Sequence, residues 1–159
     1  MEDKLSHMVR LLVPCLVLPA AIALASGSAP MQAAPPAPAA PTAESVYNQG
    51  LTLKTANKWL EAEADFRQAT TLKPDFPEAW SELGHALRKG GHYDEAVKAY
   101  QQALRLRPDF PQALEYLGET YVLMGKHEDG EQLLDRLRTL DATQAAQLEK
   151  ALGGGGSGY

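Results

Sequence analysis

The sequence predicts an all-α protein built from three similar helical hairpins and a short closing helix. The segment Lys73-Pro74-Asp75-Phe76-Pro77 returns 34 residues later as Arg107-Pro108-Asp109-Phe110-Pro111. A fixed period of this length is typical of repeat architectures. Within each period, apolar residues recur at helical spacing in two runs. We therefore expect one repeat array, with further segments at both ends of the 159-residue chain.

The first segment, residues 1–25, is predicted to be a secretory signal peptide. An uncharged apolar run extends from Leu11 to Ala25 behind a basic flank. A membrane-spanning helix needs about 20 apolar residues, so this shorter run better suits the hydrophobic region of a signal. Small residues place the cleavage after Ala25, and the mature chain would begin at Ser26 in the periplasm or outside the cell. The alternative is an uncleaved leader that anchors the protein in the membrane, facing the periplasm.

Cys15 is the single cysteine and lies inside this leader. A disulfide framework or a cysteine-based zinc site is therefore not available to the fold. A lipid anchor on Cys15 is a further alternative. Lipoprotein signals place a small residue directly before the cysteine, whereas this chain has Pro14 there and only a short apolar run ahead of it.

Residues 26–42 are predicted to be a disordered linker. They are rich in proline and alanine and carry no charged side chain. Such a composition offers too little apolar surface to compensate for the entropy lost on ordering, and it favours an extended tether.

The folded part divides into three units of equal length, at residues 43–76, 77–110 and 111–144. Equivalent positions in the three units carry related residues, for example Gly50, Gly84 and Gly118. Each unit is predicted to be one helical hairpin.

The central unit shows the hairpin pattern most clearly. Apolar stripes over residues 79–87 and 96–104 indicate two helices, and Gly90-Gly91 separates them. Gly84 is expected to let the second helix approach the first closely. Pro108 ends the second helix, because proline cannot donate a hydrogen bond into the preceding turn.

These residues give the central unit a resemblance to the tetratricopeptide repeat. The match consists of Trp80-x2-Leu83-Gly84-x2-Leu87, Ala96-x3-Tyr100-x2-Ala103 and Pro108. The resemblance implies a right-handed superhelical α-solenoid. It also implies that the first helix of each unit lines a concave groove, which holds an extended peptide or a helix of a partner.

The outer units depart from the family pattern. The first unit has Val46 and Gln49 where tryptophan and leucine are usual, and the third has Gly130 in place of the alanine and Ala142 in place of the closing proline. Terminal repeats are expected to be atypical, because only one of their faces is covered. Gly130 should cost up to about 1 kcal/mol relative to alanine in a helix interior.

A capping helix is predicted over residues 142–152. Asp141 and Gln144 have the spacing of a capping box, and apolar residues follow at helical intervals up to Leu152. Residues 153–159, which are mostly glycine, are predicted to be a flexible tail.

The composition argues against several classes of function. The net charge of −5 disfavours nucleic acid as a partner. The four histidines include no pair at metal-binding spacing, and no nucleophile elbow, phosphate-binding loop or zinc-protease motif occurs. We therefore expect a protein without catalytic activity, cofactor or metal.

The family resemblance implies which residues line the groove. Each unit contributes side chains from its first helix, and the resulting candidates are Tyr47, Leu51, Lys54, Ser81, His85, Arg88, Lys89, Gln112, Glu115 and Glu119. This lining would run from an aromatic and aliphatic end through a basic middle to an acidic and then apolar end. A mixed lining of this kind suits an amphipathic segment of a partner protein.

One subtype of the family binds the terminal carboxylate of chaperones with lysine and asparagine residues. The matching positions here carry none of these residue types: they are Tyr47, Leu51, Glu82, Gln112 and Tyr116. We therefore expect a protein-interaction adaptor with another kind of protein or peptide partner. The alternatives are a membrane-anchored scaffold that assembles an envelope complex and self-association through the terminal repeats.

Overall fold

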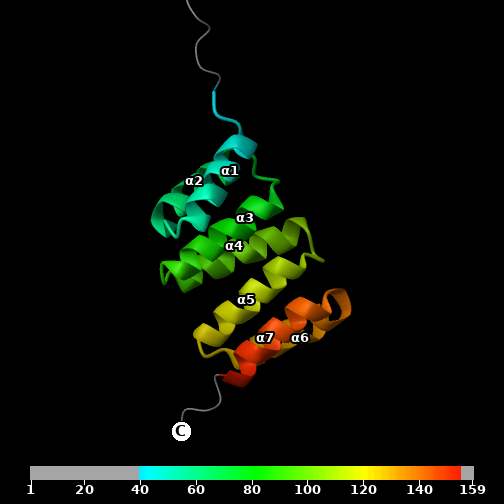
Figure 1. Cartoon of the computed structure of the whole chain (residues 1–159). Helices are drawn as coiled ribbons and strands as arrows, with labels where there is room; N and C mark the ends of the chain where they lie inside the picture. The colour runs from blue at the N-terminus through cyan, green and yellow to red at the C-terminus, as the bar shows by residue number, and fades with distance from the viewer. Residues whose placement is uncertain (1–39, 155–159) are drawn as a thin grey trace, which may run out of the picture. The chain divides into compact units, whose positions relative to one another are not determined.

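The computed structural model describes residues 40–154, and these residues form seven helices and no strand (Figure 1). The predicted signal peptide, nearly all of the predicted linker and the last five residues of the predicted tail lie outside the described residues. The helices are α1 Ala43–Thr55, α2 Trp59–Leu72, α3 Pro77–Lys89, α4 Tyr93–Leu106, α5 Pro111–Leu123, α6 His127–Leu140 and α7 Ala142–Gly154. The predicted all-α class and repeat solenoid are confirmed.

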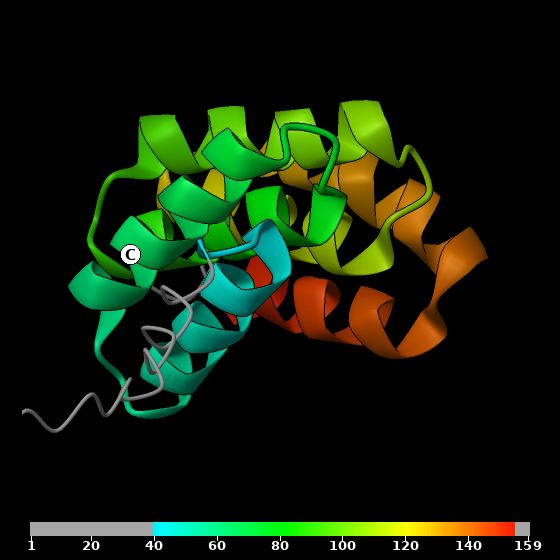
Figure 2. The same cartoon turned by 90° about the horizontal axis from the view of Figure 1, so that it is seen from above.

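The helices stack in chain order, and each packs against its sequence neighbour. Figure 2 shows α1, α3 and α5 as one layer and α2, α4 and α6 as a second layer. Among the described residues, no helix has both the length and the apolar character needed to cross a membrane.

Local sequence signals set the helix ends. Pro77 and Pro111 occupy the first turn of α3 and α5, where the missing N–H of proline costs nothing. The side chain of Asp141 accepts hydrogen bonds from the backbone N–H groups of Thr143 and Gln144, at 2.9 and 3.0 Å. It thereby caps the first turn of α7.

The three hairpin turns share one backbone conformation. Asn57, Gly91 and Gly125 are spaced by 34 residues and have φ angles of 58°, 81° and 74°. This left-handed region favours glycine and tolerates asparagine. The repeat therefore extends to the geometry of its turns.

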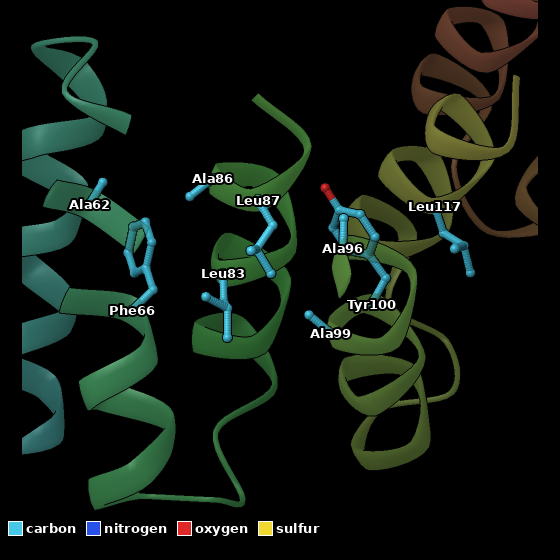
Figure 3. Packing of buried hydrophobic residues seen from close by; sticks show 9 residues of the cluster. All are labelled: Ala62, Phe66, Leu83, Ala86, Leu87, Ala96, Ala99, Tyr100 and Leu117. Carbon is cyan, nitrogen blue, oxygen red and sulfur yellow. The ribbon is translucent and has the colours of Figure 1, made fainter. Parts of the chain in front are cut away.

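The core is continuous across the first two hairpins and reaches α5. Figure 3 shows Phe66, Leu83, Leu87 and Tyr100 in one buried cluster. A Cβ atom on Gly84 would lie 2.6 Å from Cε1 of Tyr100, so glycine is needed for this close approach of α3 and α4.

The third hairpin is completed by α7, which packs against both α5 and α6. A Cβ atom on Gly118 would lie 2.5 Å from Cδ2 of Leu148 in α7, and one on Gly130 would lie 3.2 Å from Cδ2 of Leu152. Within the described residues, α7 extends to Gly154, two residues beyond the predicted Leu152.

Candidate peptide-binding groove

The ten groove candidates lie on α1, α3 and α5, and we call the surface that they form the inner wall. They differ in exposure: Ser81, His85 and Glu115 are buried, Lys89 is exposed, and the other six, Tyr47, Leu51, Lys54, Arg88, Gln112 and Glu119, are half-buried. A partner would therefore meet Lys89 and the half-buried side chains first.

Ion pairs and hydrogen bonds connect the three helices of the inner wall. The ammonium group of Lys54 on α1 lies 2.7 Å from a carboxylate oxygen of Glu82 on α3. The side-chain amide of Gln112 on α5 donates to the other oxygen of Glu82 at 3.1 Å. A second pair joins Arg88 to Glu119 at 3.1 Å. Two of the three candidate cations, Lys54 and Arg88, are thus paired with carboxylates on neighbouring helices.

A row of aromatic and cationic groups crosses the same surface. The ring of Trp59, the first residue of α2, stacks on the imidazole of His85 with centroids 5.3 Å apart. His85 also meets the edge of Tyr116 at 4.5 Å. Lys89 lies over Trp59 and Arg88 lies over Tyr116, at 5.5 and 5.7 Å from the ring centroids. Such cation–π contacts stabilise the positions of both cations.

Burial and neighbouring charges set the protonation states. Burial lowers the pKa of His85 to about 3, aided by Arg88, Lys54 and Lys89, so its imidazole is neutral at physiological pH. Burial also raises the pKa of Glu115 to about 7, and the nearby carboxylate of Glu119 adds to this effect. The charge of Glu115 therefore changes near neutral pH.

Three polar atoms on α3 are buried without a hydrogen-bond partner in the described part of the chain: Ser81 Oγ, His85 Nδ1 and Arg88 Nε. They belong to successive turns of one helix. Buried polar atoms without partners are uncommon in folded proteins. The middle of the inner wall therefore retains hydrogen-bonding capacity.

Sequence reasoning did not include Trp59, Glu82 and Tyr116 among the groove candidates. Glu82 and Tyr116 were considered only as positions of the carboxylate clamp, and Trp59 lies on a second helix, which the family rule leaves out. The pairing of Glu82 with Lys54 could have been suspected from opposite charges on facing helices. The contact between Trp59 and His85 had no such signal, because it depends on where the α1–α2 turn ends.

Two kinds of site were considered among the described residues, a metal site and the carboxylate clamp. These residues contain no group of three or more His, Cys, Asp or Glu side chains placed to hold a metal ion. At the centre of the clamp positions lies Glu82, whose carboxylate would repel the terminal carboxylate that the clamp subtype binds.

Comparisons with known proteins identify the repeats. A family model described as "TPR repeat" matches residues 84–125, and one described as "Tetratricopeptide repeat" matches residues 47–90. No curated protein sequence matches the chain.

Solved structures share the fold. The complex of the TPR2B domain of yeast Sti1 with pHsp70 has 21% identity and a TM-score of 0.67, covering 70% of this chain and 95% of that one. The first TPR of Spaghetti (RPAP3), bound to the HSP90 peptide SRMEEVD, has 18% identity and a TM-score of 0.65, covering 69% and 90%. The Yersinia enterocolitica type III secretion chaperone SycD, in complex with a peptide of the translocator YopD, has 18% identity and a TM-score of 0.64, covering 69% and 91%.

Proposed function

Because the chain is a tetratricopeptide repeat protein, we propose that it is a non-catalytic adaptor whose inner wall holds a peptide or helical segment of a partner protein. Three proteins of the same fold are seen with peptides or partner segments bound. The observation that carries the proposal is the row of aromatic and cationic side chains that crosses this surface from Trp59 on α2 over α3 to Tyr116 on α5. Such surfaces provide both apolar contact and polar recognition.

The wall's own ion pairs indicate the chemistry of the partner segment. Lys54 and Arg88 are already paired with Glu82 and Glu119, so neither cation is available to a strongly acidic tail without breaking an existing pair. We propose a segment of mixed character, with apolar side chains over Trp59 and Tyr116 and few carboxylates.

The location is part of the same proposal. The apolar leader and the Pro/Ala-rich linker favour an exported protein whose repeats reach their partner on a tether. The competing proposal is a scaffold held in the membrane by an uncleaved leader. N-terminal sequencing of the protein isolated from cells separates the two, since a mature end at Ser26 excludes the anchored form.

The binding surface can be tested with a charge swap. Arg88→Glu combined with Glu119→Lys keeps an ion pair between α3 and α5 but reverses its direction, so the fold should be retained. Wild type and the double variant are used to capture proteins from a cell-envelope extract. A partner that binds the inner wall is recovered by the wild type and reduced by about tenfold with the variant. Equal recovery by both proteins would show that the inner wall is not the binding surface.

A further inference from the structure

A hollow lies on the other side of α3, away from the inner wall. It has a volume of about 560 Å³, and its floor is formed by Trp80, Leu83 and Leu87. Figure 3 shows Leu83 and Leu87 between the helix that carries Phe66 and the helix that carries Tyr100. We call this hollow the outer cavity. It opens between α2 and α4, helices that the family resemblance did not assign to the groove.

The rim of the outer cavity is cationic. Three cations, Arg67, Lys98 and Arg105, face a single carboxylate, that of Glu95. Arg67 is already paired with Glu63 at 2.8 Å and lies 3.6 Å from Glu95. Within residues 40–154, Lys98 and Arg105 have no carboxylate within 4.0 Å. Two unpaired cations on one face contrast with the net charge of −5 of the whole chain.

The repeat architecture does not require these two cations. The positions equivalent to Lys98 in the other units are Ala64 and Gln132, and those equivalent to Arg105 are both threonine, at 71 and 139. Residues that serve the repeat fold recur at the 34-residue period, as the hairpin glycines do. Lys98 and Arg105 are therefore specific to the central unit.

Apolar surface continues beside the outer cavity. A second hollow of about 480 Å³ shares Arg67 with it and is lined by Leu60. Leu60 is 80% exposed, whereas Leu83 and Leu87 are almost fully buried. Leu60 therefore adds an exposed apolar side chain close to the outer cavity.

We propose that the outer cavity binds an acidic peptide segment, which inserts an apolar or aromatic side chain over Trp80 and places its carboxylates beside Lys98 and Arg105. This site lies outside the inner wall and does not depend on the function proposed for it. A protein with both sites holds two partner segments at once, on opposite sides of α3.

A peptide fits these observations better than an anionic membrane. The apolar lining and the two unpaired cations lie together between α2 and α4, which matches a short segment that carries both an apolar side chain and carboxylates. The net negative charge of the chain also opposes adsorption to anionic lipid.

The test uses three fluorescent twelve-residue peptides that share one phenylalanine and differ only in carrying four glutamates, four glutamines or four lysines. Binding to the full chain is measured by fluorescence anisotropy. The glutamate peptide is expected to bind at least about tenfold more tightly than the other two, and more weakly as salt rises. In a Trp59→Phe protein, Trp80 is the remaining tryptophan, and its emission should change as the glutamate peptide binds. Equal affinities for the three peptides would overturn the proposal.

Charge-reversal variants locate the site. Lys98→Glu with Arg105→Glu should weaken binding of the glutamate peptide by at least about tenfold. The matched control, Lys126→Glu with Lys150→Glu, changes the net charge equally at exposed lysines outside the cavity and should bind within about twofold of wild type. Equal loss in both double variants, or none in the first, contradicts the proposal.

Two further measurements distinguish peptide binding at the outer cavity from binding at the inner wall and from binding to a membrane. The swap of Arg88 and Glu119 on the inner wall should leave binding of the glutamate peptide unchanged, and a loss there would assign the peptide to the inner wall instead. Vesicles containing phosphatidylglycerol should not bind the full chain. If they bind through Lys98 and Arg105 while the glutamate peptide does not, the cavity recognises a membrane and the peptide proposal is wrong.

Discussion

Leu148 of α7 fills the space that Gly118 of α5 leaves open. A Cβ atom on Gly118 would lie 2.5 Å from Cδ2 of Leu148, and Leu148 is fully buried. In the first two hairpins, the corresponding space is filled from within the hairpin, by Phe66 and Tyr100. The third hairpin has the smaller Leu134 at that position, and it is α7 that reaches the glycine.

Truncation of Leu148 should therefore destabilise the whole array. Leu148→Ala removes a buried side chain next to Gly118, and we expect the free energy of unfolding to fall by about 2–4 kcal/mol. Urea denaturation followed by circular dichroism measures the change. The exposed Leu123→Ala, on the last turn of α5, is the matched control and should cost much less.

The fit between the two residues also predicts coupling. Gly118→Ala should destabilise the wild type by about 1–3 kcal/mol, because the new methyl group clashes with Leu148. The same substitution in the Leu148→Ala protein has the space it needs and should cost less. Additive effects of the two changes would show that Leu148 does not occupy the position described.

The pair between Lys54 and Glu82 makes a third prediction. Glu82 is almost fully buried and Lys54 is 23% exposed. Lys54→Met leaves the Glu82 carboxylate with only the amide of Gln112, so unfolding free energy should fall by about 1–3 kcal/mol. Lys58→Met is the control, since Lys58 and Glu61 form an exposed pair that is expected to contribute little. Similar losses for both variants would contradict this account of Glu82.

Most of the fold could be predicted from the repeat period, because each hairpin has a similar spacing of apolar residues and of residues that end or closely pack helices. Pro77, Pro111 and the glycine positions mark helix ends and close approaches that sequence alone reveals. The packing of α7 could not be derived in this way. A single residue, Asp141, joins α6 to α7, whereas four residues join α4 to α5, so the repeat register no longer tells which side chain meets Gly118.

The sequence predicted candidate residues for the inner wall, but it did not reveal how their charges are paired. Arg88 and Lys89 of the second unit were expected to give the groove a basic middle, and Lys54 was a further candidate cation. The pairing with Glu82 and Glu119 depends on side chains from neighbouring helices meeting in space, which sequence spacing does not determine. Trp59 was missed because it lies at the start of a second helix, just after a turn.

The protonation of Glu115 should make stability depend on pH. Burial raises the pKa of Glu115 from 4.5 to about 7 in the folded chain. The folded state therefore holds this proton more tightly than the unfolded state. The stability that it contributes is fully present below about pH 4.5 and is lost as the pH rises through about 7.

Replacement of Glu115 tests this dependence. Glu115→Gln keeps the shape and removes the charge, so it should raise the free energy of unfolding at pH 8 by about 1–2 kcal/mol relative to its effect at pH 5. Urea titrations at the two pH values give the comparison. Glu131→Gln, an exposed position on α6, should show no such difference. Parallel pH profiles for wild type and Glu115→Gln would contradict the proposed protonation.

The hairpin turns offer a test of backbone conformation alone. A Cβ atom on Gly91 would meet no atom within 4 Å, and its φ angle is 81°. Gly91→Ala should thus cost about 1 kcal/mol through backbone strain without any clash. Gly91→Asn should cost less, because Asn57 adopts the same conformation in the first turn. Thermal unfolding of the two variants measures the loss of stability. If both substitutions lower stability equally, backbone strain at a left-handed φ angle does not explain the loss.

The fit between α7 and the third hairpin also constrains how such a chain can grow. The first two hairpins carry their own filling aromatics, so a duplicated copy of the central hairpin could be inserted between the second and third without altering any existing contact type. A copy placed after the third would separate Gly118 from Leu148 and leave the terminal helix facing an aromatic ring. Duplication of a hairpin upstream of residue 111 would therefore keep the contact between Gly118 and Leu148, whereas insertion between the third hairpin and α7 would remove it.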